Sequence, residues 1–292
     1  MLALCCTTRH DMISINHLYT LIYTVLCPGN KKLHYNQAIH QLCTDIYYLL
    51  HGFRKYILIE YNTTIDKLIE LLDIITTRLD NQYNTCFVVL TNTIYDTYFV
   101  TYGSSEYSYV IPSINDIVFV DVSSNLTVPV VSHHNVTVDI KNVIVELNQS
   151  IQHSIKQHVQ QPNPVYVCNV LDSLPIHMST IAGILLNYPV VYVCNTDNTC
   201  LNMLSLQRIT IQCTINDITN HHHNKTQVYS SNDCIDMYSY TIPSILYDQC
   251  KYIVDKWLDN IKKVVDSNNA AYSEHLTVHQ YIESITLPRV TL

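Results

Sequence analysis

The amino-acid sequence predicts one α/β or α+β domain in which a mixed β-sheet is flanked by helices. Apolar residues recur at helical intervals of three and four near both ends of the chain, and short β-branched apolar runs lie between these stretches. Between residues 94 and 138 the pattern alternates with a period of two, which is typical of half-buried strands. The 292 residues, 48% of them hydrophobic, suffice for one large core. We therefore expect residues 1–292 to form a single domain.

Two helices are expected at the start of the chain. Residues 12–26 carry apolar side chains at the helical spacing, and Pro28-Gly29-Asn30 supplies a stop signal. Residues 36–51 repeat the pattern, and Gly52 follows them as the residue type that commonly lies just past a helix end.

A strand, a helix and a second strand come next. Residues 55–61 and 86–93 are short apolar runs with the composition of buried strands. Residues 66–79 between them have helical spacing, with Asp66 near the start and Arg78 near the end, as the helix dipole favours. This order predicts a crossover connection and a parallel strand pair.

The middle of the chain changes pattern twice. Residues 94–138 are predicted to form short antiparallel strands or a meander, and residues 140–160 return to helical spacing. Two prolines in QQPNP mark the clearest linker candidate, so an internal boundary near 161–164 is an alternative to one domain. One interlocked domain is favoured because each half alone would hold only part of a sheet.

The second half begins with a strand at residues 165–171 and a helix at 174–188. Strands at 189–194 and 199–204 are expected to form a hairpin, because the Asn and Asp residues at 195–198 suit a tight turn. Cys194 and Cys200 would then lie near the mouth of that hairpin, and whether they form a disulfide is left open.

The C-terminal part is predicted from three further patterns. Residues 216–233 lack apolar periodicity and are expected to be an exposed loop, and residues 238–243 form a short strand. Residues 244–267 form a long amphipathic helix. The remaining tail is predicted to be a helix or a strand.

The charge of the chain disfavours nucleic acid as a partner. The formal net charge is −8, with 16 Lys and Arg against 24 Asp and Glu, and the sequence contains no cluster of basic residues. Phosphate-backbone binding depends on such clusters.

The cysteines and the apolar segments point to a soluble cytoplasmic protein. The chain has 11 cysteines and an N-terminal segment without the apolar run of a secretory signal, so reduced thiols are expected. Polar residues interrupt residues 12–30, and residues 179–194 fall short of the ~20 residues that a spanning helix needs. We therefore expect no membrane partner.

Nucleotide and metal sites find little support. The four glycines are scattered singly, which excludes glycine-rich phosphate loops, so no cofactor is expected. His221, His222 and His223 are weak candidates for a metal site, because three adjacent imidazoles cannot all face one ion unless the loop folds around it. An exposed Asn/His-rich loop is the favoured interpretation, and no metal is expected.

A nucleophilic site can be assembled only from scattered residues. The best combination places Cys200 beside His177, with Asp172 or Asp197 as the orienting carboxylate. Asp172 follows a strand, at the edge of a sheet where functional groups often lie. No sequence spacing fixes a distance between these groups.

Three other carboxylates, Glu60, Asp116 and Asp121, lie near strand ends and are weaker candidates for a Mg²⁺ site. Asp116 and Asp121 are too far apart along one strand to share an ion, so only Glu60 with one of them could do so. Carboxylates in turns are the simpler interpretation.

The segment YPVVYVCNTDNTCLNMLSLQRITI resembles the most characteristic block of an uncharacterised eukaryotic protein family, uncharacterised protein family 0739, typified by the human chromosome 1 open reading frame 74 protein. Tyr188 to Tyr192 and Cys200-Leu201 match this block, whereas Asn187 and Thr199 stand where the family commonly has Gly and Asn. Three further segments are similar: KYILIEYN (55–62), YTIPSIL (240–246) and ITLPRVTL (285–292). The resemblance implies an intracellular single-domain α/β fold, and no activity, cofactor or catalytic residue can be carried over from it.

Two classes of function follow. The first is a non-catalytic interaction or adaptor domain with a protein partner, favoured because no phosphate loop, metal spacing or assembled triad is present. The second is a hydrolase that uses Cys200 or a strand-end carboxylate. The sequence leaves the question of enzymatic activity open and favours its absence.

Overall fold

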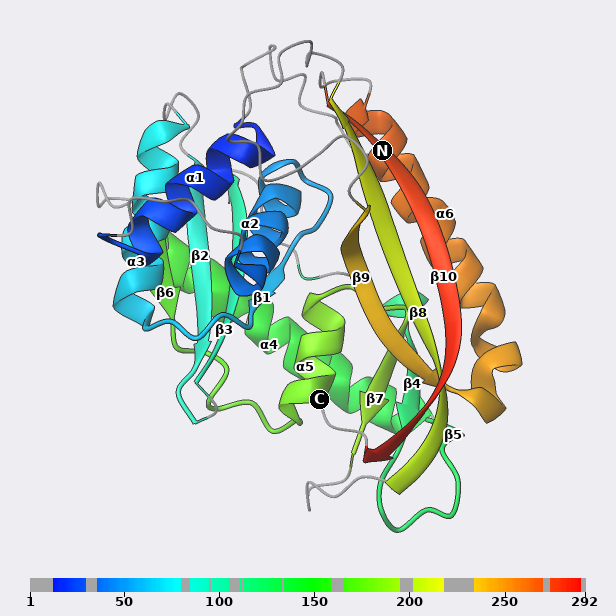
Figure 1. Cartoon of the computed structure of the whole chain (residues 1–292). Coiled ribbons are helices and arrows are strands. Elements are labelled where there is room, and N and C mark those ends of the chain that lie inside the picture. Colours follow the sequence, from blue (N-terminus) through cyan, green and yellow to red (C-terminus); the bar gives the residue numbers. More distant parts are fainter. Residues whose placement is uncertain are drawn as a thin grey trace.

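The computed structural model describes residues 13–29, 36–79, 85–94, 96–104, 111, 113–132, 134–158, 165–194, 202–217, 234–269 and 274–289. Within these ranges the chain forms an α+β fold of three sheets, which confirms the predicted fold class (Figure 1). The helices are α1 (Ile15–Leu26), α2 (Gln37–Leu50), α3 (Ile65–Arg78), α4 (His134–His158), α5 (Met178–Leu185) and α6 (Tyr247–Asn269). The strands are β1 (Ile57–Ile59), β2 (Thr85–Asn92), β3 (Thr97–Ser104), β4 (Val118–Asp121), β5 (Val130–Val131), β6 (Val165–Cys168), β7 (Val190–Val193), β8 (Asn202–Asp217), β9 (Cys234–Pro243) and β10 (Glu274–Arg289).

Side-chain caps fix where the early helices begin. Ser14 accepts a hydrogen bond from the His17 N–H, and Asn36 accepts from two N–H groups in the first turn of α2. Thr64 caps α3 in the same way by accepting from the Lys67 N–H. Gly52 has φ 71°, which is the left-handed conformation that lets the chain turn from α2 toward β1.

The first sheet has the strand order β1-β3-β2-β6. Both β1 and β2 are antiparallel to β3, so β1 and β2 run in the same direction with β3 between them. The prediction that they pair with each other is therefore wrong. Strand β3 forms a hairpin with β2 and lies between β1 and β2, so it occupies the place beside β1 that the prediction assigned to β2. The parallel neighbour of β2 is β6.

The second sheet has the order β5-β4-β7, with β4 and β7 parallel. The predicted hairpin between β7 and the following strand is wrong, because β8 pairs with β9 and β10 in another sheet. All four residues of β7 are buried, and a fully buried strand suits a parallel partner as well as an antiparallel one. The predicted turn at 195–198 lies outside the described residues.

The third sheet is antiparallel, with the order β10-β8-β9. Strands β8 and β10 are 16 residues each and pair from Glu274↔Asp217 to Arg289↔Asn202. Residues 202–217 thus form a single long strand, and the C-terminal tail, predicted to be a helix or a strand, is its partner strand. Most of the predicted loop at 216–233 lies outside the described part of the chain.

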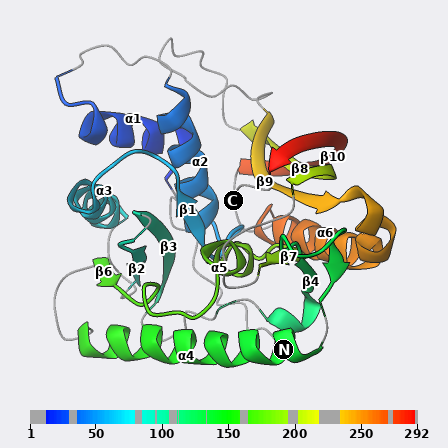
Figure 2. The same ribbon diagram turned by 90° about the horizontal axis from the view of Figure 1, so that it is seen from below.

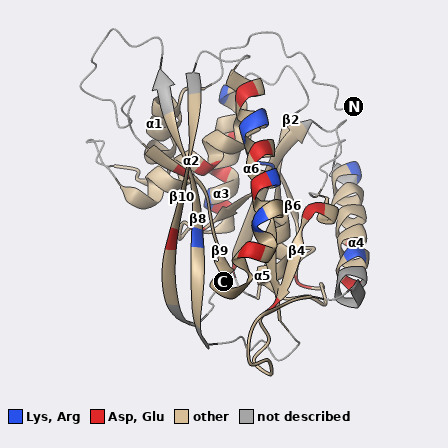
Figure 3. Cartoon of the chain, turned by 90° about the vertical axis from the view of Figure 1, so that its right-hand side faces the viewer, with Lys and Arg blue, Asp and Glu red and all other residues tan. Residues whose placement is uncertain are grey.

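The helices cover the sheets from several sides. In Figure 2, α1, α2 and α3 lie on one side of the first sheet and the long helix α4 lies on the other. Helix α6 packs against the third sheet, and Figure 3 shows Lys, Arg, Asp and Glu interspersed along it. The apolar residues on one side of α6, among them Val254, Leu258 and Ile261, are buried.

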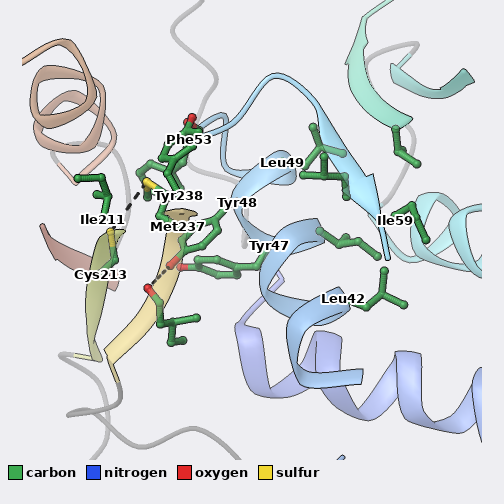
Figure 4. Close-up of a cluster of buried hydrophobic side chains, with 14 of the residues drawn as sticks. Leu42, Tyr47, Tyr48, Leu49, Phe53, Ile59, Ile211, Cys213, Met237 and Tyr238 are labelled. Carbon is green, nitrogen blue, oxygen red and sulfur yellow. Dashed lines mark hydrogen bonds between the residues drawn. The ribbon is translucent and has the colours of Figure 1, made fainter. Parts of the chain in front are cut away.

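One buried cluster connects the first and third sheets. Figure 4 shows Leu42 and Leu49 of α2 in the same cluster as Ile211 and Met237 of the third sheet. Tyr48 Oη donates a hydrogen bond to the Ile235 carbonyl across this cluster at 3.3 Å. Among the described helices, none is long and apolar enough to cross a membrane.

Candidate functional site

A cavity of about 740 Å³ lies where the edge strands of all three sheets meet. It is lined by β1 and the loop after it, the start of β3, one side of α5, β7, and residues 239–241 of β9. These elements surround the centre of the molecule in Figures 1 and 2. Its volume falls in the range of about 300–1,000 Å³ that is usual for ligand sites.

The turn between α5 and β7 sets the position of one wall. Asn187 has φ 61°, and the N–H groups of Asn187 and Tyr188 donate to the carbonyls of Ile184 (3.0 Å) and Gly183 (2.9 Å). This is the Schellman arrangement at the end of a helix, which requires a left-handed residue. Asn tolerates that conformation better than most residues, which explains how it can stand where glycine is common.

The same turn brings the backbone close to α6. The indole of Trp257 donates a hydrogen bond to the Asn187 carbonyl at 2.7 Å. The backbone at Asn187 therefore lies close to α6, as a glycine at this position would suggest, and the contact is made by the Asn187 carbonyl.

Glycine is required one turn earlier for a packing reason. A Cβ atom at Gly183 would lie 2.9 Å from Cγ2 and 3.0 Å from Cγ1 of Val191. Helix α5 thus lies directly against β7, and Thr180 Oγ1 ties the two together by donating to the Tyr192 carbonyl at 2.8 Å. This close packing is what places α5 in the wall of the cavity.

Aromatic side chains form the wall between the cavity and α6. Tyr188 stacks on Tyr240 with ring centroids 5.2 Å apart, and Trp257 meets Tyr240 edge-on at 5.4 Å and Tyr238 at 5.1 Å. Tyr188 also lines a smaller cavity of about 210 Å³ on the α6 side. Burial raises the pKa of the Tyr188 and Tyr240 hydroxyls, so both stay protonated at neutral pH.

The free edge of β9 faces β7 across the cavity. Tyr192 Oη donates to the Thr241 carbonyl at 2.9 Å, so the backbone of residue 241 points away from β8. Because this direction alternates along a strand, the backbone of Ser239 also points toward the cavity side. Among the described strands, β9 is thus an edge strand whose free edge faces the cavity, where Tyr192 engages its Thr241 carbonyl.

The charged groups that line the cavity are both acidic. Glu60 follows β1 and Asp96 precedes β3, and none of the described lining residues is Lys, Arg or His. The Tyr98 hydroxyl donates a hydrogen bond to Asp96, which raises the pKa of Tyr98. The cavity is therefore a site of negative charge with aromatic walls.

A buried ion pair lies behind Tyr188. Arg54 Nη1 and Asp45 Oδ1 are 2.7 Å apart with both side chains about nine-tenths buried, and the Arg54 guanidinium lies 5.1 Å from the Tyr238 ring centroid. Burial raises the pKa of Asp45, an effect that the charge of Arg54 opposes. Since neither residue lines the cavity, the positive charge of Arg54 is held and neutralised within the core.

His177 is the N-cap residue of α5. Its Nδ1 lies 2.6 Å from Ser179 Oγ and accepts from the Ser179 N–H at 3.3 Å. Burial lowers the pKa of His177, which keeps the imidazole neutral and able to accept these bonds. Asp172, the proposed orienting group, accepts from the Thr93 N–H at 2.7 Å and from the Thr93 hydroxyl.

The remaining predicted site residues are distributed as follows. Cys200, Asp197 and the three histidines His221, His222 and His223 lie outside the described residues. Cys194 is half-buried at the edge of the core. Within the part of the chain that the structure describes, no group of three His, Cys, Asp or Glu residues is positioned to hold a metal ion.

The three strand-end carboxylates, Glu60, Asp116 and Asp121, have different surroundings in the structure. Asp116 forms an ion pair with Lys256 at 2.7 Å, and Asp121 accepts from the N–H and hydroxyl of Ser123. Only Glu60 lines the large cavity. Its acidic neighbour there is Asp96, which sequence reasoning missed because Asp96 lies in a turn and no local pattern connects it to Glu60.

Comparisons with known proteins give a family and no activity. No curated protein and no solved structure shows significant similarity to this chain. Residues 24–292 match the profile of one family, described as Domain of unknown function (DUF4504). Because the match covers most of the sequence, the chain belongs to the DUF4504 family of domains of unknown function.

Proposed function

We propose that this chain is a non-catalytic interaction domain that binds an extended segment of a partner protein in the cavity between the three sheets. The observation that carries the proposal is the meeting of three edge strands, β1, β7 and β9, around one cavity. Edge strands offer unpaired N–H and C=O groups, and an extended peptide is the ligand that satisfies such groups along its length.

Three of the candidate catalytic groups already have hydrogen-bond or ion-pair partners within the protein, which supports binding over catalysis. His177 is used as a helix cap, Asp172 holds Thr93, and Asp116 is paired with Lys256. A nucleophile needs a base that is available to take its proton. These three groups have structural partners instead.

The sequence blocks of the family resemblance also support this site. Three of the four similar segments, 55–62, 188–211 and 240–246, contribute residues to the cavity wall. We propose on this basis that the chain is a relative of the human chromosome 1 open reading frame 74 protein and that the cavity is the shared feature.

A reducing, cytoplasmic setting is part of the proposal. The structure describes eight cysteines, and none of them is in a disulfide. Five of these, Cys43, Cys86, Cys168, Cys213 and Cys250, are buried among apolar side chains, where they act as small core residues.

The proposal is tested by filling the cavity. Ala182 lies on the cavity side of α5, so Ala182→Phe should occupy the cavity, whereas Val145→Phe adds the same ring at a position on α4 that is 53% exposed and outside the cavity. Wild type and both variants are used as bait, and partners are quantified by mass spectrometry. We expect one stoichiometric partner that Val145→Phe retains and Ala182→Phe loses, with both variants folded by circular dichroism. Equal capture by all three proteins would contradict the assignment to this cavity.

A hydrolase is the second candidate, and the observation that favours it is the presence of two carboxylates, Glu60 and Asp96, in one cavity. Paired carboxylates can act as general acid and base. A panel of chromogenic esters, glycosides and phosphates tests this activity. Turnover that is lost in Glu60→Gln or Cys200→Ser and kept in the matched surface variant Glu70→Gln would favour the hydrolase over the interaction domain.

A further inference from the structure

We propose that the group entering the cavity is a basic side chain, lysine or arginine, carried by the extended segment of the partner protein. This inference rests on the proposed function, because it names the chemistry of the segment that the cavity would bind. The three lines of support are the charge of the cavity wall, its aromatic surface and the state of the nearby cation.

The charge of the wall has one sign. Glu60 follows β1, Asp96 precedes β3, and both line the cavity, while no described lining residue is cationic. A concave site of one sign with low-dielectric walls attracts the opposite charge more strongly than a flat surface does. An anionic ligand such as a phosphate or an acidic peptide would find no counter-charge there.

The aromatic surface suits a cation as well. Tyrosine is the most frequent aromatic residue in the wall, which contains Tyr61, Tyr98, Tyr188, Tyr192 and Tyr240. The face of a tyrosine ring attracts ammonium and guanidinium groups within about 6 Å of its centroid. The protein already uses this contact behind the wall, where Arg54 lies 5.1 Å from the ring centroid of Tyr238.

Two features near the cavity could favour an anion, the cation of Arg54 and the N-terminal end of α5, and both already have partners within the protein. Arg54 is paired with Asp45 at 2.7 Å and does not line the cavity. The N-terminal end of α5 contributes Met178 and Ser179 to the wall, and the Ser179 N–H is already bound to His177 Nδ1. A helix end whose N–H groups are capped has less capacity to bind a ligand anion.

The experiment compares two pools of five-residue peptides with randomised flanking residues. One pool has lysine at the centre and the other has norleucine, which keeps the straight stem and lacks the charge. Trp257 is the only tryptophan in the chain and contacts Tyr240 in the cavity wall, so its fluorescence reports binding in the full-length protein. n-Butylammonium, the isolated side-chain group, is titrated as a third probe.

We expect the lysine pool to bind and the norleucine pool to bind at least about ten-fold more weakly, since hydrogen bonds to charged groups are worth about 1.5–3 kcal/mol. Glu60→Gln and Asp96→Asn should each weaken the lysine pool several-fold, whereas Glu70→Gln, on an exposed position of α3, should not. Asparagine suits position 96, where φ is 49°. Binding should also weaken as salt rises.

Other outcomes overturn the inference. Equal binding of the two pools, or no binding of either, would show that charge is not recognised. Binding of n-butylammonium as strong as that of the lysine pool would show a small-amine site without a peptide. If Ala182→Phe loses a protein partner that Glu60→Gln and Asp96→Asn both retain, the interaction domain stands and the basic side chain does not.

Discussion

At the residue scale, single side chains take roles that depend on where they are buried. Asn187 is an example: by sequence it is one of many asparagines, and its left-handed φ of 61° makes it the residue that ends α5 and turns the chain into β7. In the sequence, the signal was the resemblance alone, which implies that glycine is common at this position. The physical reason became clear only from the two hydrogen bonds of the turn.

His51 allows a prediction about pH at the same scale. Its side chain is 4% exposed, Nδ1 lies 2.8 Å from the Tyr47 carbonyl, and burial lowers its pKa from 6.5 to about 4. Between pH 6.5 and pH 4 the unfolded chain therefore binds a proton that the folded chain does not, so the free energy of unfolding decreases as pH falls through this window. Below pH 4 both states are protonated and this contribution no longer changes.

The test replaces His51 by glutamine, which can still donate to the Tyr47 carbonyl and does not titrate. We expect the loss of unfolding free energy between pH 7 and pH 4 to be smaller in His51→Gln by up to about 3 kcal/mol, measured by urea denaturation. His153→Gln, at an exposed position on α4, serves as the control and should follow the wild type. A His51→Gln curve parallel to the wild-type curve would show that His51 titrates normally in the folded state.

At the element scale, the contact between α5 and β7 decides the shape of one cavity wall. Helix periodicity and the apolar run of β7 were both readable in the sequence, and both elements form as predicted. Their direct approach depends on one glycine, whose lack of a Cβ lets Val191 lie against the helix backbone. The sequence showed that Gly183 is present and gave no indication of what it faces.

Gly183→Ala should destabilise the protein although alanine is the better helix former by about 1 kcal/mol. The new Cβ would lie 2.9 Å from a methyl group of Val191, a side chain that is 1% exposed and has little room to move. Overpacking of this kind costs about 1–3 kcal/mol, so we expect a net loss of roughly 1 kcal/mol by urea denaturation.

The same substitution in a Val191→Ala background provides the control. Removing the two Val191 methyl groups leaves space for the added Cβ, so Gly183→Ala should then be neutral or stabilising. A stabilising effect of Gly183→Ala in the wild-type background would show that the clash is relieved in some other way.

At the scale of the whole molecule, the buried pair of Asp45 and Arg54 connects parts of the chain that are distant in sequence. Asp45 belongs to α2, Arg54 lies in the turn toward β1, and the guanidinium packs on Tyr238 of β9. The pair thus lies at the junction of the first and third sheets. Removing one partner of such a pair leaves an uncompensated buried charge.

We expect Arg54→Met to lower the free energy of unfolding by roughly 3–5 kcal/mol, because Asp45 would remain buried without its counter-ion. The double variant Asp45→Asn/Arg54→Met should recover a large part of this loss, since no charge is then left in the core. Arg208→Met breaks the exposed pair with Glu283 and should cost less than about 1 kcal/mol. A double variant as unstable as Arg54→Met alone would mean that packing on Tyr238, and not charge, explains the effect.

The sequence by itself determined the fold class and the approximate places of the helices and strands. These features depend on residues a few positions apart, so their signals lie within short windows such as the helical spacing in α3 or the alternation in β3. It did not determine strand partners. The segments at β7 and β8 looked like a hairpin, and only the packing of β4 against β7 and of β10 against β8 shows that they belong to different sheets.

Only the tertiary structure brought Glu60, Asp96, Tyr188 and Tyr240 into one cavity. The sequence did not single out Tyr188 and Tyr240, because the chain has 23 tyrosines and nothing local distinguishes those that line the cavity. Residues separated by up to 180 positions leave no common pattern in a single sequence, and their approach follows from how three sheets pack with their edges together. The chemistry of the site is thus a property of that packing, while the elements that carry it are properties of the sequence.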